Sequence, residues 1–433
     1  MSIRALCRDP RRAVVLILVL WIVIVLTIMA YSLIFQATSE ATVTGLRKRE
    51  LQADMLARAG IAKAIVDLRN DLIFSTDDDI PRFDAEGDVW ARPEEGKDEV
   101  VLGNDDNAHY SVRVYDEEGL FNLNRMSASN MMLLQTIIER IGYDEEDAEI
   151  VAAAIVDWRD SDTTPALPNA PHTEEGMAYA MLRLEDLGQR GRVRDEDIQP
   201  IIFRNENFLT VDELLEVYGV TPDLYFGPGT PEAEYYTQKF GGPEGERFHI
   251  EERTRHRRPV NEERPLGLRD YFTVYGEGRL NINTAPHHVL AALAEAAGDT
   301  NGDQVADRVL RIRRGGRRDN FDNSNAFQEQ QDIMADNDVG SMVAAASNLY
   351  PVGVRSSVFR IIAEGKVGEV SSVKEVVAAR SLEVLIRDET FEAADRARQR
   401  RDNQSGRWER RQNRDDPSQV VYPFVRIVQA YHH

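Results

Sequence analysis

The sequence predicts an α+β protein organised around one long N-terminal helix. Three observations lead to this prediction. The chain opens with a charge-free apolar run, strand-like segments occur near residue 110 and again near the C-terminal end, and a long block of helical segments separates them. Because secondary-structure elements bury their apolar faces in packed layers, we expect the helix to pack on an antiparallel sheet, with a large all-α domain inserted into the sheet domain.

The first predicted element is a membrane-spanning helix. Residues 13–37 carry no charged side chain, and about 20 apolar residues are enough to cross a bilayer. The run is preceded by four basic residues, opposed only by Asp9: Arg4, Arg8, Arg11 and Arg12. This positive flank predicts a cytoplasmic N-terminus with the remaining chain outside. The alternative is a cleaved secretory signal, but its apolar part is usually about 7–15 residues long, so the length favours a retained anchor.

The membrane helix is predicted to continue outward. No proline occurs from residue 38 to residue 72, and apolar residues recur at helical spacing in this stretch. They are Leu56, Ile61, Ala64, Ile65, Leu68 and Leu72. We therefore expect a cytoplasmic leader of residues 1–13 and one helix over residues 14–75, whose outer half buries one face against a globular domain.

The composition limits the classes of function. The 433 residues include 74 acidic and 52 basic side chains, a net charge of −22. This charge argues against nucleic-acid binding, which relies on basic surfaces, and it leaves carboxylates that could hold calcium. Cys7 is the only cysteine and precedes the anchor. We therefore expect no disulfide, no cysteine zinc site and no cysteine nucleophile outside the membrane.

Two parts of the chain are predicted to form the sheet. Residues 109–115 alternate in strand fashion, 116–119 form a turn and 120–124 begin a second extended piece, which together predict a hairpin. Strand patterns return at 356–370 and 420–431, and residues 371–387 fit either strand or helix. We assign the sheet to residues 76–126 and 346–433.

The block between them, residues 127–345, is predicted to be an all-α domain. Helical spacing or capping signals mark six segments: 131–141, 145–158, 175–187, 211–218, 287–297 and 304–314. Thr210 and Glu213 are spaced as a capping box. Residues 226–265, rich in glycine, proline and charge, are expected to be a mobile insertion, and 320–338 and 388–418 are expected to be loops or solvated linkers.

Two segments of this chain share a sequence motif. Residues 118–124 and 277–283 both begin Glu-Gly and end in apolar-Asn-apolar-Asn, at Asn122 and Asn124 and at Asn281 and Asn283. Asparagine side chains can satisfy backbone groups at a junction between strand and helix. We interpret both motifs as structural and expect each to open a helical unit.

The strongest candidate site is acidic. Three carboxylates at the end of a predicted helix, followed by two more in the next helix, could converge on one hard cation, since calcium takes six to eight oxygen ligands. They are Asp157, Asp160, Asp162, Glu174 and Glu175. A solvated acidic loop is the structural alternative.

A weaker candidate lies between the last two predicted helices. Its residues are Asp299, Asn301, Asp303 and Asp307, which begin like a calcium loop. However, Gln304 stands where that loop needs glycine and Leu310 where it needs a bidentate acid. We name no catalytic residue, because the sequence has no nucleotide-binding loop, no HExxH and no GxSxG.

Several longer motifs resemble the minor pseudopilin K family of type II secretion systems (general secretion pathway protein K). They are the head RRAVVL with Trp21, LARAGIAKAIVDL, EEGLFNLN, AAAIVDWRDSD, FLTVDELLEVYGV and YFTVYGEGRLNINTAPHHVLAAL. The resemblance implies a pilin-like helix and sheet with an inserted α-domain. It also implies a non-enzymatic protein at the tip of a periplasmic pseudopilus, which promotes pseudopilus assembly and the export of folded proteins.

The resemblance also implies processing. A prepilin peptidase would cut between Ala13 and Val14, although the family usually has glycine where Ala13 stands. Most pilins carry glutamate at the fifth position of the mature protein. This family lacks that glutamate, and this chain has Leu18 there. Such a glutamate could pair with the terminal amine of a neighbouring subunit in lipid, so a subunit without it suits the end of a fibre.

The resemblance implies a setting and partners as well. We expect a single-pass inner-membrane protein with a periplasmic C-terminal domain. Its partners would be minor pseudopilins of the I, J and H types, the major pseudopilin, the prepilin peptidase and inner-membrane lipid, with the secretin and secreted substrates as further candidates. Calcium binding in the α-domain would fall on Asp157, Asp160, Asp162 and Glu175.

Two other functions remain open at the sequence level. A competence-type pilin could bind DNA through the helical hairpin of residues 287–314 and the arginine-rich stretches 253–258 and 396–414, although the acidic balance argues against it. An anchored hydrolase could use the carboxylate cluster with a metal, although no nucleophile or histidine ligand set supports it.

Overall fold

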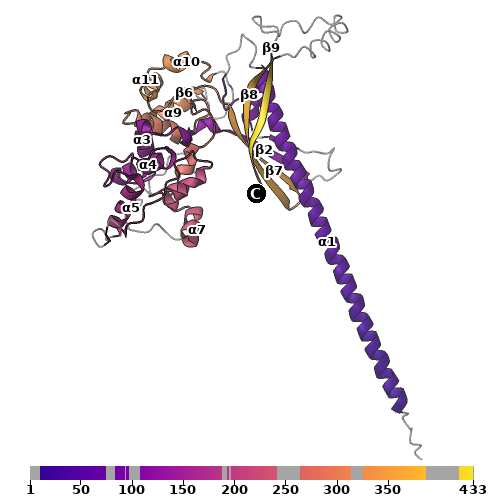
Figure 1. Ribbon diagram of the computed structural model, residues 1–433. Helices are drawn as coiled ribbons and strands as arrows, with labels where there is room; N and C mark the ends of the chain where they lie inside the picture. The colour runs from indigo at the N-terminus through magenta and orange to yellow at the C-terminus, as the bar shows by residue number, and fades with distance from the viewer. Residues whose placement is uncertain are drawn as a thin grey trace, which may run out of the picture.

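The computed structural model describes residues 10–74, 83–92, 94–96, 108–187, 193–194, 197–240, 264–313, 325–386 and 419–432. The predicted fold class is confirmed: one long N-terminal helix packs on an antiparallel sheet, and a helical domain is inserted into the sheet domain (Figure 1). The predicted arginine-rich stretches, most of the 226–265 insertion and all of 388–418 lie outside the described residues.

Helix α1 (Pro10–Phe74) has two halves with different surroundings. From Ile17 to Phe35 its large apolar side chains are exposed, and Figure 1 shows this half extending well beyond the sheet. From Ala53 onward one face packs on strands β2, β7 and β8. Its buried residues are Ala53, Leu56, Ala57, Ile61, Ala64 and Leu68. The helical spacing in the outer half therefore marked the packed face correctly.

Close packing of α1 depends on a glycine in the sheet. A Cβ on Gly365 of β7 would lie 2.0 Å from the Ala53 carbonyl oxygen and 2.6 Å from the Ala57 nitrogen. No real side chain tolerates such distances, so only glycine lets the helix backbone approach the strand this closely. The small residues Ala53 and Ala57 meet it from the helix side.

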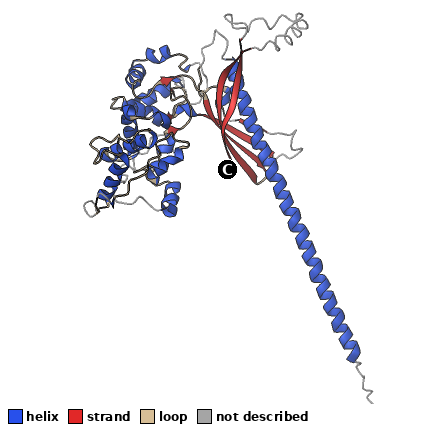
Figure 2. Ribbon diagram, viewed as in Figure 1, coloured by secondary structure: helices blue, strands red, loops and turns tan. Residues whose placement is uncertain are grey.

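The main sheet has five strands in the order β1-β2-β7-β8-β9, all antiparallel. They are β1 (Glu94–Gly96), β2 (Ala108–Asp116), β7 (Val358–Val367), β8 (Val370–Ile386) and β9 (Gln419–His432). Figure 2 shows α1 lying along this sheet, with the helical domain beside it. The segment that fitted either strand or helix is strand β8.

The predicted hairpin over residues 109–124 is wrong. A 3-10 turn, η2 (Glu117–Gly119), follows β2 and carries the chain into the helical domain instead of back along the sheet. The next strand, β3 (Phe121–Asn122), pairs in parallel with β4 (Phe272–Thr273). Phe121 is fully buried in the helical core, so burial overrides the local hairpin pattern.

The described part of the inserted domain is mainly helical. Its α-helices are α3 (Met131–Ile141), α4 (Glu145–Arg159), α5 (Glu175–Asp186), α6 (Pro222–Phe226), α7 (Pro231–Phe240), α8 (His287–Ala296), α9 (Gly302–Arg313), α10 (Gln330–Ala335) and α11 (Asn337–Ala346). Its 3-10 turns are η3 (Leu123–Arg125), η4 (Ala128–Asn130), η6 (Val211–Glu216) and η7 (Leu268–Asp270). Strands β5 (Leu280–Asn281) and β6 (Val352–Gly353) pair in parallel at its boundary. The helical and sheet cores are separate clusters.

Two local predictions in this domain are wrong. The segment at Thr210 forms the 3-10 turn η6, and the Thr210 side chain makes no capping bond. Glu213 instead accepts hydrogen bonds from the Leu209 nitrogen (3.1 Å) and from Arg204 (2.6 Å). The predicted loop over 320–338 contains the short helix α10, which buries Ile333 in the helical core. In both cases packing or a nearby charge overrides the local sequence signal.

Candidate functional site

The first candidate cation site surrounds the end of helix α4. Asp157 lies in its last turn and is fully buried, Asp160 caps the helix, and Asp162 lies exposed in the following loop. Glu175 opens α5 and is buried, whereas Glu174 is exposed, and its backbone nitrogen donates to His172. The structure therefore brings four of the five predicted residues into one neighbourhood and leaves the Glu174 side chain in solvent, but no three of the four bring carboxylate oxygens within 4.8 Å of one another.

Asp157 anchors this loop. Its Oδ1 accepts from the Ala166 nitrogen (2.8 Å) and its Oδ2 accepts from the Tyr179 hydroxyl (2.7 Å). Burial raises the pKa of Asp157 to about 7, and the nearby charges of Glu175 and Asp160 add to this shift. Burial likewise raises the pKa of Tyr179, which stays a hydrogen-bond donor.

Asn205 joins the cluster from a distant part of the chain. Its Nδ2 donates to Glu175 Oε1 (2.9 Å) and to the Asp162 carbonyl oxygen (2.7 Å), and its backbone adopts φ of 53°. Asparagine tolerates this left-handed conformation better than most residues. Nothing in the local sequence marks Asn205 as a site residue, because only the fold brings it to α5.

Three buried oxygen atoms of this cluster have no protein donor: Asp160 Oδ1, Glu175 Oε2 and Asn205 Oδ1. A buried polar atom without a partner costs about 1–3 kcal/mol, so a neighbouring group that satisfies several of them is expected. Burial raises the pKa of Asp160 and of Glu175, and the charge of Asp162 adds to both shifts. An all-oxygen set of this kind fits a hard cation such as calcium.

The cluster borders a surface cleft of about 590 Å³. Asp160, Asn205 and Glu206 line this cleft together with two arginines, Arg159 and Arg204. An ion could therefore enter from solvent, and water could complete a coordination shell that the protein atoms fill only in part.

The second candidate site is occupied by protein partners. Asp299 Oδ1 accepts from the Asn301 backbone nitrogen (2.8 Å). Asp303 pairs with Arg140 (2.9 Å), and Asp307 lies 3.3 Å from His287 Nε2. These contacts give two of its carboxylates structural roles between helices, so the structure does not assemble them around a common point.

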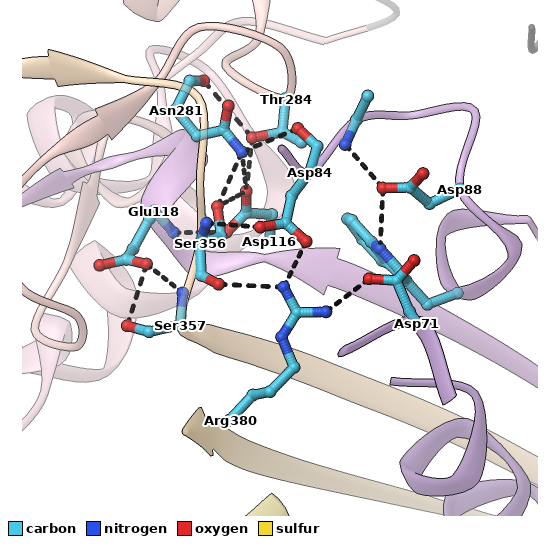
Figure 3. A network of polar contacts seen from close by, with 12 residues as sticks. Asp71, Asp84, Asp88, Asp116, Glu118, Asn281, Thr284, Ser356, Ser357 and Arg380 are labelled. Atoms are coloured by element: carbon cyan, nitrogen blue, oxygen red, sulfur yellow. Dashed lines mark hydrogen bonds and ion pairs between the residues drawn. The ribbon is translucent and has the colours of Figure 1, made fainter. Parts of the chain in front are cut away.

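A third acidic group was missed by the sequence analysis. Among the described residues, carboxylate oxygens of Asp71, Asp84 and Asp88 form the group of three that lie within 4.8 Å of one another. Figure 3 shows Arg380 of β8 at this place. Its guanidinium pairs with Asp71 (2.7 Å) and Asp84, donates to the Ser356 carbonyl oxygen (3.2 Å) and lies 4.8 Å from the Phe359 ring centroid. The buried guanidinium already supplies the positive charge here.

Another carboxylate, the half-buried Asp116, lies in the same network (Figure 3). Its Oδ2 accepts from Thr284 Oγ1 (2.5 Å), from Asn281 Nδ2 (3.1 Å) and from Ser356 Oγ. The pKa of Asp116 is raised to about 7, mainly by burial; the hydrogen bonds from Ser356 and Thr284 oppose this shift, and the charges of Asp84 and Glu118 add to it. Since Asn281 and Thr284 precede α8, this carboxylate ties the sheet to the helical domain.

The two asparagine motifs have the same geometry. The Asn124 side chain donates to the Phe208 carbonyl (3.0 Å) and accepts from its nitrogen (2.8 Å). The Asn283 side chain does the same with Phe327, at 2.8 and 2.9 Å. Each clamp fixes a distant loop beside a helix pair, which supports the structural interpretation of both motifs.

The membrane segment is the other functional feature. Among the described residues, one helix, α1, is long and apolar enough to cross a membrane, and its most hydrophobic window has a mean hydropathy of 2.8 and no residue buried in the protein. Residues 1–9 lie outside the described residues. Ala13 and Val14 belong to the backbone of α1, but their side chains are not among those described.

These features define a class of protein: a pilin-like protein whose sheet domain carries an inserted helical domain. Two family models match the chain, both described as type II secretion system protein K, over residues 119–226 and 280–345. The predicted resemblance to this family is confirmed over these two stretches, which lie in the inserted helical domain.

Other comparisons add little to this assignment. The chain is similar to a chain in the crystal structure of the GspK–GspI–GspJ complex from the type 2 secretion system of enterotoxigenic Escherichia coli. The two are 12% identical, the TM-score is 0.48, and the match covers 89% of this chain and 99% of the other. No curated protein matches the sequence significantly.

Proposed function

We propose that this minor pseudopilin occupies the tip of a periplasmic pseudopilus and promotes its assembly, without enzymatic activity. The observation that carries the proposal is the shape of the molecule. The helical domain lies beside the sheet (Figure 1), and a subunit with so large a lateral domain is accommodated more easily at the end of a fibre than inside it. The exposed half of α1 from Ile17 to Phe35 also lacks any charge that would need a subunit above it.

The proposal includes a topology and partners. The basic leader would remain in the cytoplasm, the apolar half of α1 in the inner membrane, and both folded domains in the periplasm. Partners would be minor pseudopilins of the I, J and H types and the major pseudopilin, with the prepilin peptidase acting between Ala13 and Val14. The folded domains would contact the secretin and the secreted proteins on the side that faces away from the inner membrane.

Deletion and complementation test this function. Loss of the gene should abolish export of folded substrates and leave fewer surface-detectable pseudopili when the major pseudopilin is overproduced. Immunogold labelling should place the protein at fibre ends, in about one copy per fibre. Unchanged export after deletion, or label spread along the fibres, would contradict the proposal.

We further propose that the helical domain holds calcium through Asp160, Glu175 and Asn205, with Asp162 and Asp157 completing the site. The three orphaned oxygen atoms support this choice. Calcium would offset the repulsion between these carboxylates and hold the α4–α5 loop to the segment that carries Asn205.

Calorimetric titration of calcium into chelator-treated protein tests the site. Asn205→Ala and Asp160→Asn should each weaken binding about 10-fold or more, whereas Glu174→Gln, which alters the exposed neighbour, should leave it unchanged. The second candidate supplies a control, since Asp299→Asn should have no effect. Equal binding by Asn205→Ala and the parent would overturn the assignment.

A further inference from the structure

The described contacts place one buried polar network at the meeting point of α1, the sheet and the helical domain (Figure 3). Asp71 comes from the last turns of α1, Arg380 from β8, and Asp116 from the end of β2. Asp84 belongs to the segment after α1, and Thr284 to the start of the second half of the helical domain. A change in this network therefore acts on all three parts at once.

Asp84 is the central link. It is 4% exposed, and its carboxylate pairs with Arg380 and accepts from the Ser356 nitrogen (2.8 Å). Its backbone nitrogen donates to the Val354 carbonyl (2.8 Å), and its carbonyl accepts from Asn281 (3.1 Å). Its polar groups are thus held by β8, by the segment between β6 and β7, and by β5.

The charges in this network do not balance. The acidic groups that face Asp116 are Asp84 from the segment after α1 and Glu118 from η2, with Asp71 of α1 beyond Asp84. Arg380 of β8 is the cation within the network, and its guanidinium is bound by Asp71 and Asp84. The remaining neighbours of Asp116 are neutral donors: the Glu118 backbone nitrogen, which donates to its Oδ1 (2.9 Å), and the side chains of Asn281, Thr284 and Ser356, which donate to its Oδ2.

Other charged groups around the network are already paired. Arg360 of β7 pairs with Glu117 (2.5 Å), and Arg313 of α9 pairs with Glu86 (2.9 Å). Glu118 accepts from the backbone nitrogens of Glu277 and Ser357. The half-buried carboxylate of Asp116 therefore has no cation of its own in the part of the chain that the structure describes.

We propose that Asp116 is a proton-dependent lock between the sheet and the helical domain. With Asp116 protonated, the network holds one fewer buried negative charge, and its bonds to Asn281 and Thr284 keep the helical domain in a fixed orientation. With Asp116 ionised, repulsion from Asp84 and Glu118 is relieved when the carboxylate moves toward water, which loosens the domain. The lock is a property of this chain and does not rest on the tip position.

Thermodynamic linkage gives the direction in which pH shifts the balance between the closed and the loose form. Burial raises the pKa of Asp116 to about 7, against an ordinary value near 4, so the closed form binds more protons across this window. Acidification should favour the closed form, and rising pH should favour the loose form. Each unit of pKa difference between the two forms changes their ratio about tenfold.

Double electron–electron resonance, which measures the distance between two spin labels, tests the lock in the full chain in detergent. Labels are placed at exposed positions, Arg69→Cys in α1 and Ala344→Cys in α11, after Cys7→Ser removes the native thiol. We expect one narrow distance distribution near pH 5.5 and a broader or second population near pH 8.5, about 1.5 units on either side of the Asp116 transition. Asp116→Asn should remain narrow at both pH values.

Matched variants separate the lock from general destabilisation. Thr284→Val removes a donor to the ionised carboxylate and should move the transition to higher pH. Thr230→Val alters another buried threonine of the helical domain and should leave the midpoint unchanged. Circular dichroism checks that each variant is folded. If Asp116→Asn does not fold, the comparison of Thr284→Val with Thr230→Val tests the lock instead. Identical parent distributions at both pH values, an unchanged response in Asp116→Asn or an unmoved midpoint in Thr284→Val would overturn the lock.

Discussion

Arg380 and Asp71 form an ion pair of 2.7 Å across a separation of 309 residues, and the Arg380 side chain is only 4% exposed. The pair fixes the end of α1 on strand β8. Burial raises the pKa of Asp71, and the opposing attraction of Arg380 keeps part of that shift in check. This contact shows that α1 and the sheet are held together by an ion pair as well as by apolar packing.

Loss of Arg380 should be strongly destabilising. Arg380→Gln would remove the cation from the buried Asp84 and the half-buried Asp71, and breaking a buried pair in this way typically costs about 3–5 kcal/mol. Urea denaturation of the full protein in detergent, followed by circular dichroism, measures this cost. Arg308→Gln, which removes an exposed pair with Asp336, is the control and should leave the midpoint nearly unchanged.

The contact between helix and sheet should be intolerant of a methyl group at Gly365. Gly365→Ala would place its Cβ against the Ala53 carbonyl, and such overpacking typically costs about 1–3 kcal/mol. Thermal unfolding and limited proteolysis at the outer half of α1 should report this change. Gly45→Ala meets nothing within 4 Å in the exposed part of α1 and should stabilise the helix by up to about 1 kcal/mol. Equal effects of both variants would contradict the steric argument.

The two asparagine clamps should have similar energetic weights. Asn124→Ala and Asn283→Ala each leave a buried backbone nitrogen and carbonyl of a phenylalanine without a partner, at about 1–3 kcal/mol per unsatisfied group. Denaturation of the single and double variants gives both costs and their coupling. Asn→Asp keeps the acceptor and loses the donor, so it should be the milder change at each clamp.

The metal-free helical domain should become less stable as pH rises. The pKa of Asp157 is raised to about 7 by burial, against an ordinary value near 4 in the unfolded chain. The folded state therefore binds more protons between these values, and the free energy of unfolding falls as pH rises through the window. Denaturation near pH 5 and near pH 8, in chelator, measures the slope, and Asp157→Asn should flatten it.

Calcium affinity should show the opposite trend. Protons compete with the metal for Asp157, Asp160 and Glu175, whose pKa values are all raised by burial. Binding should therefore weaken as pH falls below about 7, with protons released on binding. Titrations in buffers of different ionisation enthalpy measure that release. An affinity independent of pH would place the metal elsewhere.

The sequence was most informative where one period or one motif decided the structure. The spacing of Leu56, Ala64 and Leu68 identified the face of α1 that packs on the sheet, and the Asn124 and Asn283 motifs marked both helical units. These signals are local, since each depends on residues a few positions apart. The charge-free run likewise needs no knowledge of the fold.

The sequence was least informative where distant segments meet. Asn205 reaches Glu175 only because the loop before η6 folds back over α5, and Asp84 reaches Arg380 across the whole helical insertion. No short pattern marks either residue. The predicted hairpin failed for a related reason, because Phe121 is needed in the helical core and pulls the chain out of the sheet after Asp116.

Asp116, at the end of β2, pairs with Phe359, at the start of β7, so the two ends of the helical insertion are sheet neighbours. The insertion leaves and returns at one point and interrupts no hydrogen-bonded ladder. The insertion is therefore a separable unit, because a tight turn between β2 and β7 could replace all of it. The remaining strands would still form a continuous antiparallel meander packed on α1. A simple pilin could have acquired such a domain in a single step, without redesign of its sheet.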